Sequence, residues 1–249
     1  MPITELQKQL LAHHNADYTN GLTTSEASSR RNNQLGNSGG GLNKVQKPIN
    51  CPSWVCCLLP CINHIPSMKQ FRYVQPDDAE VLRDNGRWIR YDAASLVSGD
   101  IIRLAEGDVV PADCVVISLG MEHVDATIIV DEENVNGDCG GNESSSMDDL
   151  TVDSHYITGE TKPRHVCRSN QTVPSTLLYY GSRVLEGACI ALVTGCGERT
   201  LLAKLIKEGR WPPKGDLSDE VEEIGRMNMD ESTTNDDYDS AGIALVQRY

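Results

Sequence analysis

LVSGDIIRLAEGDVVPAD, residues 96–113, alternates short apolar runs with glycine and proline turns. The apolar run at 101–104 has the residue types that favour a strand. Gly107 and Pro111 then mark turns, and a second apolar run, CVVIS, follows at 114–118. We therefore expect two strands joined by a turn-rich connection at the centre of the fold.

Three aspartates stand in or beside these turns, namely Asp100, Asp108 and Asp113. One reading makes them a metal or acid site. The other is turn capping, because an aspartate beside a Gly or Pro-Ala turn can hydrogen-bond to its own backbone. We favour turn capping and expect no metal site in the chain.

The segments around this stretch also have the pattern of strands. Two strand-like runs flank Asp84-Asn85-Gly86, and Asn-Gly suits the tight primed turn of a hairpin. TVDSHYI at 151–157 and the run at 177–195 add further strands. The body at 71–209 is therefore expected to be mainly β, a distorted jelly roll or small sandwich, within a chain that is α+β overall.

Helices are expected on both sides of this body. Residues 3–14 carry an apolar stripe at helical spacing. Thr23 can cap a second helix, with Glu26 three residues later completing a capping box. At the other end, Thr200 begins a closing helix that Gly209 ends.

Composition divides the chain into four expected regions. They are a helical amino-terminal extension (1–35), a flexible linker with a Cys-rich apolar segment (36–70), the β body (71–209) with a disordered acidic insertion at about 131–150, and an acidic disordered tail (210–249). The net charge of −14 is local, since residues 121–153 and 216–239 hold ten acidic residues each. Such runs are typical of solvated segments. The remainder lacks the clustered Lys/Arg with aromatics that nucleic-acid binding needs, so no nucleic-acid partner is expected.

The cysteine content and the amino terminus indicate where the chain works. MPITELQKQLLAHH has no positive region followed by an apolar run, so we expect no signal peptide. Nine cysteines, an odd number, suit reduced thiols in the cytosol. A membrane-spanning helix needs about 20 apolar residues, and no stretch supplies them. We expect a cytoplasmic chain without a transmembrane helix.

The most apolar window, CPSWVCCLLPCI at 51–62, leaves two readings open. Its cysteines depart from the paired CxxC spacing of zinc sites, so a metal is not expected. Cys56, Cys57 and Cys61 are candidates for acylation, which would give peripheral contact with a membrane. The alternative is an apolar plug packed under the domain.

DSHYITGETKPR, residues 153–164, places a carboxylate in a tight loop. Strand-forming residues precede Thr158-Gly159-Glu160, and Gly159 permits a sharp turn that a side chain would resist. Pro163 then stops regular strand pairing. The implied geometry is a strand that ends in a loop presenting Glu160 to solvent at its tip.

Three motifs now stand in one order: the stretch at 96–113, the loop at 153–164, and YYGSRVLEGACIALVTGCGERT at 179–200. In this order and spacing they resemble the actuator domain of P-type cation-transporting ATPases, over about 140 of the 249 residues. Residues 21–37 resemble, less specifically, the amino-terminal extension of these pumps. Three motifs in context are far more specific than a lone TGE triplet.

The resemblance implies a hydrolytic role. In this family the actuator domain swings its TGE loop against an aspartyl phosphate carried by another domain. Glu160 would position and polarise the attacking water, Gly159 would allow close backbone approach, and Thr158 would support the loop. The residues that would hold the loop's shape are Asp153, His155, Thr161 and Pro163. Mg²⁺ and ATP would belong to the partner or missing domains, so we expect no cofactor in this chain.

Departures from the family pattern limit what the chain can do. His155 stands where the family usually has Ser, and Arg164 where Val usually follows the proline. No DKTG-type phosphorylation motif occurs, so at most the phosphatase step of a pump is expected. Two functions fit: a subunit, fragment or truncated form of a cation pump that acts on an aspartyl phosphate elsewhere, and a stand-alone regulatory module that kept the actuator fold.

Overall fold

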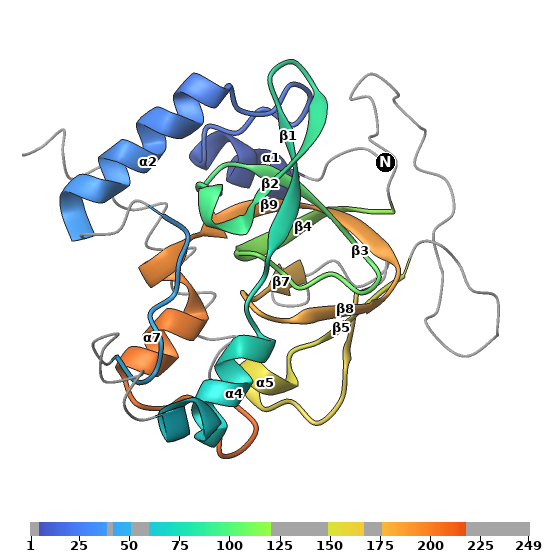
Figure 1. The fold of residues 1–249 in the computed structure, drawn as a ribbon. Coiled ribbons are helices and arrows are strands. Elements are labelled where there is room, and N and C mark those ends of the chain that lie inside the picture. Colours follow the sequence, from blue (N-terminus) through green and yellow to red (C-terminus); the bar gives the residue numbers. More distant parts are fainter. Residues whose placement is uncertain (1–4, 39–41, 51–59, 121–148, 167–175, 218–249) are drawn as a thin grey trace, which may run out of the picture.

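The computed structural model of the chain describes residues 5–38, 42–50, 60–120, 149–166 and 176–217. These residues form two antiparallel sheets with helices at the periphery (Figure 1), so the expected mainly β class is confirmed. The larger sheet has the strand order β2-β1-β3-β9-β4-β7, and the smaller has β6-β5-β8.

The larger sheet contains the strands expected around residues 96–113. In sheet order its strands are β2 (Arg87–Asp92), β1 (Asp78–Arg83), β3 (Ile101–Ala105), β9 (Ala188–Gly195), β4 (Asp113–Leu119) and β7 (Leu177–Leu178). β9 lies between β3 and β4 and is apolar on both faces, which agrees with its central place.

The smaller sheet lies against the larger one and carries the TGE loop (Figure 1). Its strands are β6 (Arg164–Val166), β5 (Leu150–Asp153) and β8 (Arg183–Glu186). The main hydrophobic cluster joins the two sheets, because Ile102 and Val116 of the larger sheet pack with Val152 and Val184 of the smaller one. Burial of this shared apolar surface fixes the position of the smaller sheet.

The amino-terminal helices cover the end of the larger sheet where the β1–β2 hairpin turns (Figure 1). They are α1 (Glu5–His13) and α2 (Thr24–Ser38). The hairpin is confirmed, with residues 84–86 forming a three-residue loop rather than the expected two-residue turn. Leu22 bridges to Arg83, and the Thr23 hydroxyl accepts the Glu26 amide as the capping box predicts.

The remaining helices are short. They are α4 (Pro66–Tyr73), α5 (His155–Thr158) and α7 (Leu201–Lys207), with 3-10 turns η1 (Pro60–His64), η2 (Ala93–Ser95) and η4 (Gly197–Arg199). Thr200 caps α7 as predicted, since its side chain accepts the Ala203 amide. Figure 1 shows α4, α5 and α7 on the side of the molecule away from α1.

Two of the three aspartates behave as turn caps. Asp100 accepts the amide of Val97 at 2.9 Å, and Asp108 accepts that of Ala105 at 2.8 Å. Asp100 also forms a buried ion pair with Arg83, at 2.6 Å. Asp113 differs, because its carboxylate accepts amides from distant segments, as described below.

The structure corrects one strand and shows order in two expected flexible segments. The predicted strand at 151–157 ends at Asp153, and α5 follows it. Asn43, in the expected linker, is buried and donates to the carbonyl oxygens of Ala93 and Pro111. Residues 210–217, assigned to the disordered tail, pack on the domain. The acidic insertion at 131–150 lies almost wholly outside the described residues, as do Cys56 and Cys57 and the tail beyond 217.

Candidate functional site

The TGE loop connects β5 to β6. The Asp153 carboxylate accepts the His155 amide at 2.8 Å and starts the single turn of α5. The turn ends at Gly159, whose φ of 78° lies in the left-handed region that glycine adopts without strain. The sharp turn predicted at Gly159 is thus present, and it sends the chain from α5 directly to Glu160.

Glu160 is not at a solvent-exposed tip, which corrects the sequence expectation. Only 8% of the residue is exposed. Its Oε1 accepts the Arg164 guanidinium at 2.7 Å and the Thr158 hydroxyl at 3.0 Å. The loop therefore folds its carboxylate back onto its own side chains. Sequence reasoning missed Arg164, although the charge at a usually apolar position was a visible signal.

Several predicted support residues contact the loop. Thr158 is fully buried, and its hydroxyl also lies 3.2 Å from the Ser154 carbonyl oxygen. The His155 ring Nδ1 lies 3.1 Å from the Glu160 carbonyl oxygen, where it can donate. Thr161 and Pro163 are exposed. The roles of these residues in function stay predictions.

The segment at 210–217 lies across the loop. The Trp211 indole N–H donates to the Tyr156 carbonyl oxygen at 2.8 Å. The Leu217 amide donates to the Thr158 carbonyl oxygen, also at 2.8 Å. A Cβ placed on Gly159 would overlap the carbonyl oxygen of Gly215. The close approach of these two backbones gives Gly159 a second reason to be glycine.

The connection from β7 to β8 contacts the start of the loop. The Ser154 and Ser182 hydroxyls are 3.0 Å apart. Asp113 accepts the amides of Tyr180 and Leu201, at 2.8 and 2.6 Å, and so ties β4 to this connection and to α7. Burial of the carboxyl group raises the pKa of Asp113 to about 6 despite these bonds. Sequence analysis did not find this long-range role.

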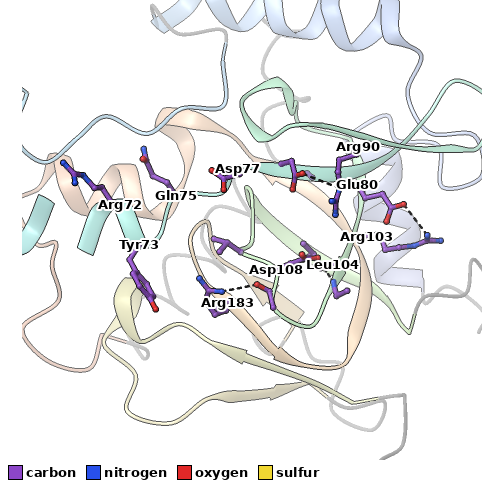
Figure 2. A pocket seen from close by; sticks show the side chains of 15 residues that line it. Arg72, Tyr73, Gln75, Asp77, Glu80, Arg90, Arg103, Leu104, Asp108 and Arg183 are labelled. Carbon is purple, nitrogen blue, oxygen red and sulfur yellow. Dashed lines mark hydrogen bonds and ion pairs between the residues drawn. The ribbon is translucent and has the colours of Figure 1, made fainter. Parts of the chain in front are cut away.

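An open groove of about 610 Å³ lies between the end of α4 and the larger sheet, and no residue of the TGE loop lines it (Figure 2). Tyr73 and Arg183 stand at its end near α5, and the Tyr73 ring packs on that of Tyr156 at 5.5 Å. Toward the other end, Arg103 faces Glu80 at 3.7 Å. Arginines and carboxylates line the groove in equal number, with Arg72, Arg90, Arg103 and Arg183 opposite Asp77, Asp78, Glu80 and Asp108. This balance gives the groove no marked preference for an anion or a cation.

Two further features of the described residues concern metal ions and membranes. Within the described ranges, no group of three or more His, Cys, Asp or Glu side chains could hold a metal ion. In the same part of the chain no helix is both long and apolar enough to cross a bilayer. Cys61, the one acylation candidate that the structure describes, is exposed.

The chemistry available at the loop comes from one carboxylate. The Thr158 hydroxyl and the Arg164 guanidinium both donate to Oε1 of Glu160. A carboxylate offers about four lone-pair sites, so the group keeps capacity to accept a hydrogen bond from water. A carboxylate in this setting can orient a water or take its proton, provided that its covering contacts open.

Comparisons with known proteins concern the domain that carries this loop. A family model of the P-type ATPase actuator domain matches residues 73–139. The chain is 28% identical over 140 residues to calcium-transporting ATPase 4, endoplasmic reticulum-type, of Arabidopsis thaliana, covering 56% of this chain and 11% of that protein. It is 25% identical over 142 residues to the sodium/potassium-transporting ATPase subunit alpha of Hydra vulgaris, with 55% and 11% covered.

Solved structures are also similar. One of them is that of a zinc-transporting PIB-type ATPase in the E2.Pi state, with a TM-score of 0.38 and 19% identity, covering 63% of this chain and 21% of that chain. The chain thus spans about a tenth of the length of the curated relatives described above.

Proposed function

Taking as premise that this chain carries a P-type ATPase actuator domain, we propose that it works as part of, or together with, a cation-transporting ATPase. In this proposal its TGE loop promotes hydrolysis of an aspartyl phosphate on a partner or missing domain. The observation that carries the proposal is the loop itself. Thr158 ends the helical turn that follows the buried strand β5, and Gly159 and Glu160 come directly after it. A family model of the actuator domain matches residues 73–139, which precede this loop in the chain.

The proposed chemistry needs little beyond a well-placed carboxylate. An acyl phosphate is labile, so the main tasks are to hold a water in line for attack and to accept its proton. Glu160 would do both. Mg²⁺ and the cationic side chains that neutralise the phosphoryl group would come from the phosphorylated domain.

The burial of Glu160 adds a requirement to this proposal. Its carboxylate must exchange at least part of its contact with Arg164 and Thr158 for a water at the phosphorylated site. The loop's own side chains, rather than the hydrophobic core, make these contacts. A local rearrangement of the loop is therefore enough, and the two sheets need not separate.

The test uses a P-type ATPase whose own TGE glutamate has been replaced, so that its phosphoenzyme accumulates. Adding the 249-residue chain should speed phosphoenzyme decay. Glu160→Gln should reduce this acceleration at least about 100-fold, the usual effect of losing a general base. Glu186→Gln, which alters an exposed glutamate on β8, should behave as wild type. Equal decay with wild type and Glu160→Gln would reject the catalytic role.

A second candidate function is a non-catalytic module that regulates a pump by occupying the actuator's docking surface. The closed Glu160–Arg164 contact favours it, since an ion-paired carboxylate is not free to act on a water. This function predicts that wild type and Glu160→Gln bind the pump equally well and that neither changes the decay rate. Binding measured alongside decay therefore separates the two functions.

The relation of this chain to a longer pump is tested at the level of the transcript. An open reading frame that continues into membrane helices and a DKTG motif would make the chain one segment of an entire pump. The proposed partner would then lie in the same polypeptide, while the role proposed for Glu160 would stay the same.

Peripheral membrane contact through Cys56, Cys57 and Cys61 is a separate proposal. Thioester-linked lipid would place the chain near a membrane-embedded pump. Hydroxylamine treatment should release the chain from the membrane fraction if the thiols are acylated. Recovery that is unchanged by hydroxylamine would count against acylation.

A further inference from the structure

We propose that Arg164 is a positioning residue for Glu160, which it holds against the domain until the loop docks. The release of Glu160 from Arg164 on docking rests on the function proposed above. The arrangement itself is a property of the free chain and can be tested there.

The ion pair closes the loop at its base. Arg164 is the first residue of β6 and pairs with Val152 of β5, so its backbone is fixed by the smaller sheet. Glu160 lies four residues earlier, within the loop that joins the two strands. A 2.7 Å contact between the guanidinium and the Glu160 carboxylate therefore connects the loop to the first residue of the strand that follows it.

The guanidinium is held from a second side. Its Nη1 lies 3.4 Å from the Leu177 carbonyl oxygen of β7, and its central carbon lies 5.6 Å from the centre of the Tyr179 ring. Both partners of the ion pair are nearly covered, with side-chain exposures of 12% for Arg164 and 10% for Glu160. The arginine is thus anchored to the body of the domain, and the glutamate is the partner that can leave.

The charge of Arg164 suits it to this task. Burial, the largest single influence, opposes the charged guanidinium, but the charges and hydrogen bonds of Glu160 and Tyr179 together outweigh it, so the pKa of Arg164 is raised. Charge-assisted hydrogen bonds are roughly twice as strong as neutral ones. The valine expected here from the family pattern could offer the carboxylate neither charge nor hydrogen bond.

The Glu160–Arg164 ion pair should weaken the apparent affinity of the chain for a phosphorylated partner. If the loop can act only after the ion pair opens, the apparent affinity for a phosphorylated partner falls by the fraction of molecules that are open. Removing the arginine should therefore lower the concentration of chain needed for half-maximal acceleration of phosphoenzyme decay.

The direct test measures how accessible the Glu160 carboxyl is in the full chain. A water-soluble carbodiimide with an amine nucleophile labels accessible carboxyl groups, and mass spectrometry locates the label. Arg164→Met should raise labelling of Glu160 at least threefold, and Arg164→Lys, which keeps the charge, should return it toward the wild-type level. Glu186 is exposed and serves as an internal reference whose labelling should not change.

Unchanged labelling of Glu160 in Arg164→Met would overturn the proposal. So would equal labelling in the Met and Lys variants, or a parallel rise at Asp100, which is fully buried and whose labelling would then indicate general loosening. Should Arg164→Met unfold, Arg164→Gln gives the same comparison with Arg164→Lys. If labelling follows the prediction but no variant affects phosphoenzyme decay, the role of Arg164 stands and the proposed hydrolytic function fails.

Discussion

At the scale of single residues, the Glu160 side chain shows what local sequence can and cannot predict. The turn at Gly159 followed from its neighbours, and the structure has it. The burial of Glu160 could not be predicted in this way, because it depends on Arg164. The Arg164 side chain comes close to Glu160 only once β5 and β6 have paired. The long-range bonds of Asp113 could not be predicted for the same reason.

A pH dependence of stability follows from His14. Burial, aided by His13, Arg199 and Arg30, lowers the pKa of His14 from 6.5 to about 4. The unfolded chain then binds more protons than the folded one between these values, so stability is lost as the pH falls from 6.5 toward 4. The loss reaches up to about 3 kcal/mol, at 1.36 kcal/mol per pKa unit. Urea unfolding of wild type and His14→Gln across this range should show a smaller loss in the variant.

Asp113 affects the pH dependence of stability in the opposite direction to His14. Its pKa of about 6 lies above the ordinary 3.8, so its contribution to stability is present at low pH and is lost as the pH rises toward 6. Asp113 is the same in both proteins, so the difference between them isolates His14. Parallel pH profiles for wild type and His14→Gln would show that the histidine is not buried in its neutral form.

At the scale of elements, the segment at 210–217 is the least expected part of the site. The sequence assigned it to an acidic disordered tail, and its contacts with α5 arise only in the folded molecule. The strands and the closing helix were more predictable, because alternating apolar runs, turn residues and the Thr200 cap act locally. The single turn of α5 was predicted as strand because four residues are too few to show helical periodicity.

Two glycine variants test how the 210–217 segment contacts the loop. Gly159→Ala and Gly107→Ala both put a side chain at a positive φ, 78° and 89° respectively, and share that cost. Only the first adds a methyl group that overlaps Gly215, whereas Gly107 has open space around it. Gly159→Ala should therefore lower the free energy of unfolding by about 1–3 kcal/mol more than Gly107→Ala, the usual effect of overpacking.

Hydrogen exchange gives a local readout of the same contact. The Leu217 amide, which donates to Thr158, should exchange faster in Gly159→Ala than in Gly107→Ala. Equal exchange at Leu217 in the two variants would mean that the segment does not rest on the loop.

At the scale of the whole molecule, the two sheets and the amino-terminal helices build a rigid support for one loop. Leu11 of α1 packs with residues of four strands of the larger sheet, namely Leu82, Ile101, Ile117, Ile190 and Leu192. The smaller sheet, α5 and the 210–217 segment hold the loop on the other side of the molecule (Figure 1). Among the described residues no group of three or more His, Cys, Asp or Glu side chains could hold a metal ion. Under the proposed function, the phosphorylated aspartate and its metal ion would come from another domain, in this polypeptide or in another.

The most direct measurement places the loop in a working pump. A P-type ATPase whose own actuator segment is exchanged for residues 73–217 removes any question of affinity, because the domain is covalently attached. Rapid-quench measurement should show phosphoenzyme decay about 100-fold faster with Glu160 than with Gln at this position. Identical decay in the two chimeras, with both forming phosphoenzyme normally, would contradict the claim that this loop serves aspartyl-phosphate hydrolysis.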